Sequence, residues 1–182
     1  DLWCKGKLSR QMALLREEGV PVCYTDEIWI RNGKRVNQKK RHAKYSGMIF
    51  AHCLPLCIIS PSSVVIKKEI LSTVGFFDEE LVVCEDYDLW LRITARYPVV
   101  FLSEPLIVKR GGHDDQLSRR YEAMDRFRVQ SLAKLLRSGV CTGDQERMAK
   151  EELRKKCSIL AGGAVKRGKK EEALYYESLS SV

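Results

Sequence analysis

The stretch from Gly75 to Arg92, GFFDEELVVCEDYDLWLR, constrains the fold of this chain more than any other. Two adjacent acids within it, Glu85 and Asp86, stand directly before apolar residues that recur at helical spacing. Backbone N–H groups and the helix dipole favour negative side chains in a first helical turn. The pattern therefore predicts an amphipathic helix that begins at the acidic pair, and helix capping alone would explain these two acids.

The composition is that of a globular protein with a core of its own. The chain has 182 residues, of which 45% are apolar. Its most apolar stretch, Met48 to Ile59, is interrupted by His52 and Pro55 and is shorter than the roughly 20 residues that a membrane-spanning helix needs. Seven cysteines without regular spacing favour free thiols in a reducing compartment over a disulfide framework. These features predict a soluble, cytoplasmic protein.

The net charge of +8 is concentrated in two segments. Seven Lys or Arg and no Asp or Glu lie between Arg31 and Lys44, and fifteen basic and nine acidic residues lie from Arg119 to the end. Such segments could face an acidic substrate, anionic lipid at the inner face of the membrane, or only solvent. Nucleic acid is not expected as a partner, because the basic residues lack the interleaved aromatic residues and the motifs typical of nucleic-acid-binding proteins.

Predicted strands alternate with predicted helices along most of the chain. The predicted strands span residues 20–30, 35–36, 58–66, 99–102 and 105–109, and the predicted helices span residues 7–18, 47–53, 67–74, 121–137, 145–162 and 169–179. Leu8, Met12 and Leu15 are expected on the buried face of the first helix, and Asn32-Gly33 is typical of a two-residue hairpin turn. The alternation predicts an α/β fold.

Residues Val74–Glu79 and Glu85–Arg92 resemble, in this order, the GxFDE and ED-x-D-x-x-x-R segments of family 2 inverting glycosyltransferases. The resemblance implies the acceptor-side half of a GT-A (Rossmann-like) α/β fold. It also implies that Asp86 is the base that removes a proton from the acceptor hydroxyl, because such a hydroxyl is a poor nucleophile until its proton is being accepted. Glu85 would orient the loop or accept a hydroxyl of the acceptor.

The first residues resemble the end of this family's Asp-x-Asp-Asp run and the Leu-Trp and Lys-Leu-x-x-Gln that follow it. Asp1, Leu2-Trp3, Lys7-Leu8 and Gln11 match. The resemblance implies that Asp1 and Trp3 bind substrate, that Asp1 ligates Mg²⁺ or Mn²⁺, and that the donor-binding half lies upstream. The chain alone is therefore expected to be inactive or nearly so. A helix-flanking acid is the other interpretation of Asp1.

The segment from Arg110 to Ser118 resembles the flexible segment that closes over the nucleotide diphosphate in this family, where an Arg, a His and a Gln-x-Ser are common. By this resemblance Arg110, His113, Gln116 and Ser118 bind substrate, and His113 is the second metal ligand. A solvated loop histidine is the alternative. The paired glycines Gly111-Gly112 permit a close backbone approach to a ligand.

Two polar segments leave alternatives open. Thr25, Asp26 and Glu27 interrupt a predicted strand, and they lie either near the sugar or acceptor, by resemblance, or at a solvent-facing strand edge. Residues 34–44 are expected to form a mobile basic loop that could approach an acidic acceptor or a lipid-linked phosphate.

The resemblance divides the chain into residues 1–118, the C-terminal part of a glycosyltransferase domain, and residues 119–182, a helical extension. Within the extension, Gly163–Tyr176 resembles the turn and second helix of a tetratricopeptide unit, although a solenoid needs about three such units. The implied reaction moves a sugar from a nucleotide-diphospho-sugar to a glycan or lipid-linked acceptor with inversion, as in bacterial cell-envelope polysaccharide synthesis. The alternatives are a basic module that binds an anionic polymer and an inactive transferase fragment.

Overall fold

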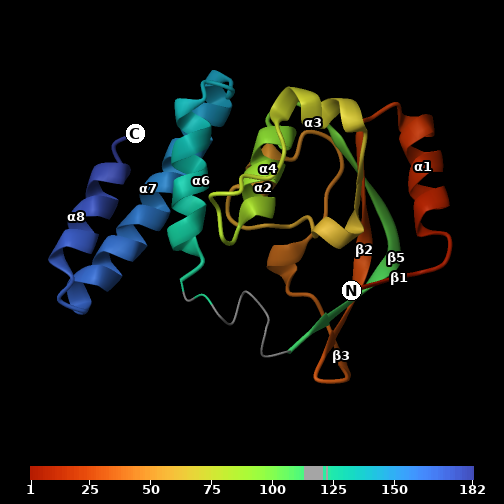
Figure 1. Ribbon diagram of the computed structural model, residues 1–182, viewed down its shortest axis with the longest axis horizontal. Coiled ribbons are helices and arrows are strands. Elements are labelled where there is room, and N and C mark those ends of the chain that lie inside the picture. Colours follow the sequence, from red (N-terminus) through yellow and green to blue (C-terminus); the bar gives the residue numbers. More distant parts are fainter. Residues whose placement is uncertain (113–120, 122) are drawn as a thin grey trace.

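Helices lie on both faces of a small mixed β-sheet (Figure 1). The structure is a computed structural model that describes residues 1–112, 121 and 123–182. In chain order its elements are β1 (Leu2–Trp3), α1 (Lys7–Glu18), β2 (Val22–Arg31), β3 (Lys34–Val36), a 3₁₀ turn (Lys40–His42), α2 (Phe50–Cys53), a second 3₁₀ turn (Pro61–Ser63), β4 (Val64–Ile66), α3 (Lys68–Val74), α4 (Glu85–Thr94), β5 (Val99–Gly111), α6 (Asp125–Arg137), α7 (Gly143–Lys166) and α8 (Lys170–Leu179). The predicted α/β class is confirmed.

A parallel pair, β2 and β5, forms the centre of the sheet. β1 pairs with the other edge of β5, while β3 and β4 pair with successive parts of β2, and all of these pairs are antiparallel. β5 is one strand of 13 residues where the sequence predicts two. Pro105 does not end it, because the register with β2 shifts at Asp26 and a proline is tolerated at such a bulge.

Different helices cover the two faces of the sheet (Figure 1). α1 covers one face, where Cys23 and Val100 pack with Leu15. α2, α3 and α4 cover the other face, where Val22 and Tyr24 join the main apolar core together with buried side chains of α4. Successive side chains of a strand point to opposite faces, so consecutive residues of β2 are buried in two different apolar layers.

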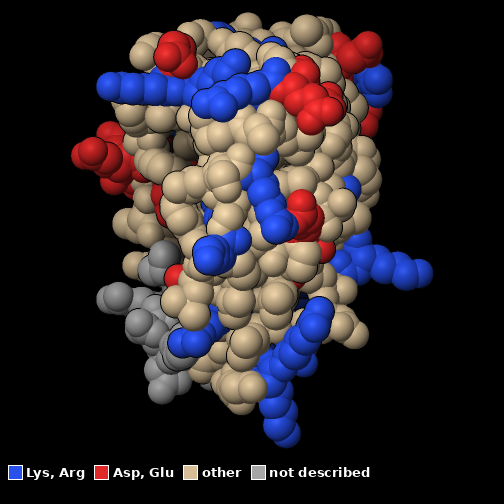
Figure 2. All heavy atoms as spheres, turned by 90° about the vertical axis from the view of Figure 1, so that its right-hand side faces the viewer, with Lys and Arg blue, Asp and Glu red and all other residues tan. Residues whose placement is uncertain are grey.

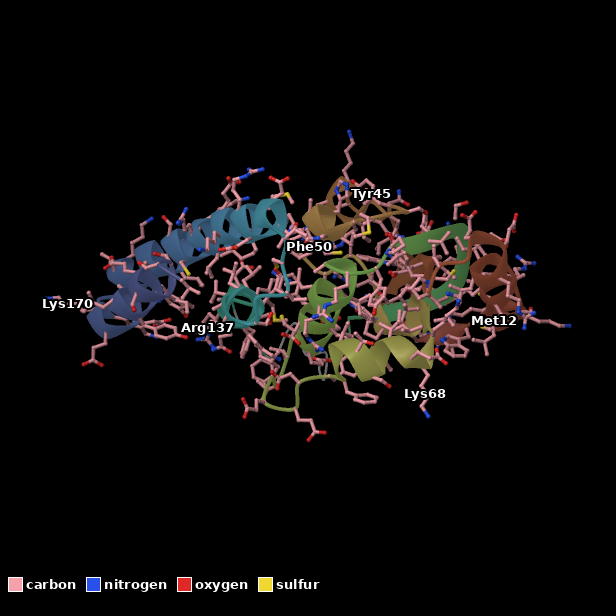
Figure 3. All side chains as sticks on the ribbon, turned by 90° about the horizontal axis from the view of Figure 1, so that it is seen from above. Met12, Tyr45, Phe50, Lys68, Arg137 and Lys170 are labelled. Atoms are coloured by element: carbon pink, nitrogen blue, oxygen red, sulfur yellow. The ribbon has the colours of Figure 1, made fainter. Side chains whose placement is uncertain are left out.

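The bounds predicted for the first helix are confirmed, but its predicted buried face is confirmed only at Leu15. Leu8 and Met12 are 47% and 40% exposed, and Met12 projects from one end of the molecule (Figure 3). The buried face carries Lys7 and Gln11 together with Leu15. The Gln11 side-chain amide donates to two carbonyl oxygens at 3.0 and 2.9 Å, so a polar side chain occupies a position that hydrophobic periodicity reserves for an apolar one.

The predicted hairpin is confirmed together with its turn. Asn32 and Gly33 have φ values of 50° and 75°, the left-handed conformation that a type I′ turn requires at both positions. β2 and β3 pair on either side of this turn. The basic segment that follows is not a single open loop, because it includes β3 and the 3₁₀ turn at Lys40–His42.

Two predicted elements in the middle of the chain are shorter than expected. Only Phe50–Cys53 is helical, and Ser46 does not cap a helix but accepts a hydrogen bond from the Phe101 N–H at 2.9 Å. The strand predicted at residues 58–66 is reduced to β4, because Pro61–Ser63 turns as a 3₁₀ helix. Residues 57–62 are therefore free of strand pairing, and their polar groups can contact other elements.

Three helices follow the sheet and pack one on another. α6 lies against α4, α7 against α6 and α8 against α7, which puts Lys170 and Met12 at opposite ends of the molecule (Figures 1 and 3). The main apolar core continues from the sheet through α4 and α6 into α7 and α8.

The helical extension differs from its prediction at two places: α6 begins at Asp125 and not at Tyr121, and α7 does not end at Gly162. α7 begins at a capping box formed by Thr142 and Gln145 and continues through Gly162 to Lys166. The predicted end of this helix at Gly162 is therefore wrong. The chain turns at Gly168, whose φ of 72° suits glycine at the end of a helix.

All seven cysteines are free thiols, in agreement with the prediction from their irregular spacing. Four of them, Cys23, Cys53, Cys84 and Cys157, are buried. Within the described ranges, no helix combines the length and the apolar composition needed to cross a membrane.

Candidate functional site

The acidic pair stands at the start of α4, as predicted. Cys84 precedes the helix with a φ of 64°, which is uncommon for a residue other than glycine, and Glu85 and Asp86 are half-buried in the first turn. Asp86 Oδ2 accepts a hydrogen bond from the Cys57 thiol at 3.3 Å, and Oδ1 accepts one from the Tyr87 N–H at 2.7 Å. The carboxylate of Asp86 is thus held in one orientation while it remains partly exposed.

The other polar residues of the motif stabilise the structure around this pair. Asp88 is buried, and its carboxylate pairs with Arg92 at 2.7 Å and with Lys134 at 3.4 Å. Arg92 also donates to the carbonyl oxygens of Val74 and Phe76, which ties the turn before α4 to the helix itself. The motif therefore contains a structural ion-pair network and, outside that network, the acidic pair.

Replacing Gly75 by Ala is expected to destabilise the fold by about 1–3 kcal/mol. Gly75 has a φ of 84° and a ψ of 171°, a region that essentially only glycine adopts, and an added Cβ would lie 3.3 Å from Nη1 of Arg92. Gly162→Ala is the matched control, because nothing lies within 4 Å of a Cβ added there and Ala favours a helix by up to about 1 kcal/mol. Urea unfolding measures the difference, and equal midpoints for the two variants would contradict this account of the turn.

A buried polar cluster lies where β2 and β5 run side by side. Glu27 accepts hydrogen bonds from Lys44 Nζ at 2.9 Å and from Trp29 Nε1 at 2.6 Å. Lys109 donates to Ser60 Oγ at 2.7 Å, and its Nζ lies 5.5 Å from the centroid of the Trp29 ring. We call these five residues the polar cluster. It combines one buried carboxylate with two lysines.

The polar cluster corrects two expectations. Glu27 is 6% exposed and Thr25 is fully buried, so neither lies at a solvent-facing strand edge. Lys44 is not a mobile cation, since its side chain is 6% exposed and paired with Glu27. Burial by itself raises the pKa of the Glu27 carboxyl, but the charges of Lys44 and Lys109 outweigh burial and hold this pKa below its ordinary value.

Residues 57–62 connect the polar cluster to the acidic pair. Lys44 Nζ donates to the Ile58 carbonyl at 2.8 Å, and one residue earlier the Cys57 thiol donates to Asp86. Burial, and then the neighbouring Asp86 carboxylate, raise the pKa of the Cys57 thiol, so it stays protonated at neutral pH and its single proton lies between Asp86 Oδ2 at 3.3 Å and the Ile59 carbonyl at 3.1 Å. The candidate base and the two lysines of the cluster are therefore attached to one short segment.

The far end of this segment holds two predicted substrate-binding residues. The Ser62 hydroxyl donates to Asp1 Oδ2 at 2.6 Å, and the Arg110 N–H donates to Asp1 Oδ1 at 3.3 Å. The side chains of Asp1 and Arg110 are exposed there. The structure thus brings Asp1 and Arg110 together, next to the segment that also contacts Asp86.

Trp3 is placed differently. It pairs with Ile107 in the β1–β5 ladder, and its side chain is 55% exposed. Its ring lies 4.2 Å from Lys7 Nζ, a buried ammonium that has no hydrogen-bond partner among the described residues. Within the residues that the structure describes, Trp3 makes no hydrogen bond to residues 57–62. Its predicted contact with substrate therefore stays a prediction.

The remaining predicted residues, His113, Gln116 and Ser118, lie outside the described residues, and their roles stay predictions. Gly112, just before them, has a φ of 95°, and a Cβ added there would collide with the side chain of Asn32. The close approach observed at the paired glycines is therefore an approach to the hairpin turn.

Of the two predicted metal ligands, Asp1 lies within the described residues and His113 does not. Residues 1–112, 121 and 123–182 contain no group of three His, Cys, Asp or Glu side chains placed to hold a metal ion. Mg²⁺ often binds through one or two carboxylates together with water and substrate phosphates, so the Asp1 carboxylate is compatible with the expected site. Binding of Mg²⁺ or Mn²⁺ by Asp1 and His113 remains a prediction.

Sequence reasoning missed three members of this site: Lys109, Ser60 and Cys57. Lys109 had one available signal, because it and Arg110 are two adjacent cations directly after the apolar strand residues Leu106–Val108. Ser60 and Cys57 carry no signal of their own, since their contacts depend on which parts of β5 and α4 pack against them.

The comparisons with known proteins do not place this chain in a family. No protein-family model matches it, and no curated protein matches it either. The interpretation of the site therefore rests on its geometry and on the sequence resemblance.

Proposed function

We propose that the chain is the acceptor-side half of a GT-A-type inverting glycosyltransferase, which moves a sugar from a nucleotide-diphospho-sugar to a hydroxyl of a glycan or lipid-linked acceptor. One observation carries the proposal: residues 57–62 form hydrogen bonds to Asp86, Lys109 and Asp1 at 3.3, 2.7 and 2.6 Å. One segment thus forms hydrogen bonds to a candidate base (Asp86), a cation (Lys109) and a second carboxylate (Asp1). The proposed displacement uses groups of these three kinds.

In the proposed reaction Asp86 accepts the proton of the acceptor hydroxyl while that oxygen attacks the anomeric carbon. The new C–O bond forms as the bond from this carbon to the diphosphate oxygen breaks, and attack from the opposite side inverts the configuration. A positioned general base contributes about 10²–10⁴-fold to the rate. The hydrogen bonds from Cys57 and Tyr87 orient the carboxylate, and Glu85 would accept a second hydroxyl of the acceptor.

The charge of the departing diphosphate is matched by cations at the end of β5. Lys109 forms no ion pair with a described residue, although its charge also acts on Glu27, and Arg110 follows it with an exposed side chain. A bound Mg²⁺ or Mn²⁺ would act as a Lewis acid on the diphosphate. Asp1 and His113 would hold the ion, and Gln116 and Ser118 would complete the contacts to the donor.

A donor-binding half would find an apolar surface to pack on. Leu2, Trp3, Leu8 and Met12, from β1 and α1, are between 40% and 55% exposed. Exposed apolar patches commonly mark interaction surfaces. We propose that the donor-binding half covers these side chains and extends the sheet beyond β1.

The 182-residue chain by itself is expected to transfer no sugar above background, because the proposed donor contacts are incomplete. The measurement is release of nucleoside diphosphate from a panel of nucleotide sugars with Mn²⁺ present. Weak donor binding in calorimetry agrees with the proposal. Robust turnover by this chain alone would contradict the half-domain assignment.

The proposed function itself is tested with the full natural polypeptide that contains these residues. We expect one donor of the panel to be consumed in the presence of an acceptor, and the product glycoside to show inverted anomeric configuration by NMR. A retained configuration, or the absence of both hydrolysis and transfer for every donor, would overturn the proposal.

A further inference from the structure

A cavity lies beside the polar cluster, between β2 and the 3₁₀ turn at Lys40–His42. It measures about 340 Å³ and is largely open to solvent, so a ligand bound there would stay partly exposed. Its lining includes Asp26, Gln38, Lys39, Lys40, His42 and Phe101. The reaction proposed above assigns no role to these side chains.

Two side chains of the cavity are suited to bind hydroxyl groups. Gln38 Nε2 donates to Asp26 Oδ1 at 2.9 Å and to the Glu27 carbonyl at 3.0 Å, which fixes the positions of the Gln38 and Asp26 side chains. Asp26 Oδ2 and Gln38 Oε1 accept no hydrogen bond from a described residue, so both can accept one from a ligand. The half-buried ring of Phe101, 5.3 Å from that of Tyr24, adds an apolar wall.

The mouth of the cavity is cationic. Lys39 and Lys40 are exposed and form no ion pair with any described residue. The same holds for Arg31, Lys34 and Arg35 on the adjoining hairpin. Figure 2 shows Lys and Arg side chains projecting from the lower end of the face that it draws, while most of the acidic side chains on that face lie higher. An anionic group would therefore be attracted to this end.

His42 responds to the positive potential in the cavity. Burial lowers the pKa of its imidazole, and the charges of Arg41, Lys44 and Lys109 lower it further, against the opposing charge of Glu27. An anion bound beside His42 would raise this pKa, because an opposite charge favours the protonated form.

We propose that this cavity binds an acidic sugar unit of the acceptor glycan, with its carboxylate or phosphate at Lys39 and Lys40 and its hydroxyls at Asp26 and Gln38. The inference rests on the proposed glycosyltransferase function and names the acceptor class. A bare polyanion suits the cavity less well, because the Asp26 carboxylate repels further negative charge but accepts hydrogen bonds from sugar hydroxyls.

The cavity is connected to the candidate base. Lys44 contributes to the cavity wall and donates to the Ile58 carbonyl. The next residue towards the N-terminus, Cys57, holds Asp86. In this proposal, the adjoining part of the acceptor follows residues 57–62 from the cavity towards Asp86.

Calorimetry on the folded chain tests the ligand class. The probes are a galacturonic acid tetramer, its uncharged methyl ester, glucose 6-phosphate and a short polyglutamate, all at about 0.15 M salt, where exposed charges are screened beyond about 8 Å. We expect an acidic sugar, as carboxylate or as phosphate, to bind at least about tenfold more tightly than the methyl ester and polyglutamate. Equal affinity for the methyl ester, or tighter binding of polyglutamate, would overturn the proposal.

Two double variants test the location. Lys39→Gln/Lys40→Gln should weaken binding of the acidic sugar at least about tenfold, because the loss of one hydrogen bond to a charged group lowers affinity by about this factor. Lys34→Gln/Arg35→Gln removes the same charge from the hairpin outside the cavity and should change the affinity by less than about twofold. Equal losses in both variants would show a diffuse basic surface and contradict the cavity site.

A proton NMR titration of His42 gives a readout that is independent of affinity. In the parent protein, the pKa of His42 should rise when the galacturonic acid tetramer is added. In Lys39→Gln/Lys40→Gln, the same concentration of tetramer should leave the pKa of His42 at the value that this variant has without ligand. An unchanged pKa in the parent protein at saturation would also contradict the cavity site. These binding measurements need no turnover. A wrong cavity assignment would therefore appear as absent or nonselective binding, whereas a wrong assignment of Asp86 as the base would appear only in the rate of sugar transfer.

Discussion

Asp86→Asn is expected to lower kcat for sugar transfer by about 10²–10⁴-fold, the contribution of a positioned general base, in the full natural polypeptide. Asn has nearly the same shape, but its single amide oxygen can keep only one of the two hydrogen bonds that Asp86 accepts, from the Cys57 thiol or from the Tyr87 N–H. It cannot accept the proton of the acceptor hydroxyl. Donor affinity should therefore change little, and the free energy of unfolding should fall only by the contribution of one hydrogen bond, about 0.5–1.5 kcal/mol, while kcat measured at saturating donor and acceptor falls.

Two control variants separate this effect from general damage to the motif. Glu80→Gln removes an exposed acid from the turn before α4 and should leave kcat within about twofold of the parent. Asp88→Asn weakens the buried ion pairs with Arg92 and Lys134, so it should lower stability in addition to any change in rate. If Asp86→Asn transfers sugar at the rate of the parent, Asp86 is a helix-capping acid, and the interpretation as a basic binding module is preferred.

Lys44→Met is expected to lower the free energy of unfolding at neutral pH by about 3–5 kcal/mol, because removing one partner of a buried ion pair leaves an uncompensated charge. The side chains of Lys44 and Glu27 are only 6% and 1% exposed. After the substitution, Glu27 would keep the hydrogen bond from Trp29 without a paired cation. Urea unfolding measures the loss. Arg147→Met, which removes exposed ion pairs, is the control and should leave the urea midpoint close to that of the parent.

Two further measurements separate charge from packing at this pair. Glu27→Gln/Lys44→Met leaves no buried charge and should recover part of the stability that Lys44→Met loses. The pKa of Glu27 is lowered in the folded parent, so the stability from the pair is present above the unfolded-state pKa and disappears as pH falls through the lower folded pKa. The difference between parent and Lys44→Met should therefore shrink below about pH 4. A difference that is constant from neutral to acidic pH would contradict the ion-pair account.

Local features of this protein were predictable because a few consecutive residues determine them. The helix that starts at Glu85 follows from acids before an apolar period, and the hairpin follows from the ability of Asn32 and Gly33 to adopt positive φ. The end of α3 at Gly75 has the same kind of cause. Hydrophobic periodicity failed for α1, because the buried carbonyl groups that Gln11 satisfies belong to other parts of the chain.

The sequence by itself determined the α/β class, the bounds of several elements and the acidic pair, since backbone preferences and side-chain periodicity act over a few residues. Only the tertiary structure decided that Lys44 and Glu27 form a buried pair and that residues 57–62 hold both Asp86 and Asp1. The physical reason is that the free energy of a charged side chain depends on its solvation and on the groups packed around it. In this fold those groups come from strands and loops far away in the chain, so no local pattern records them.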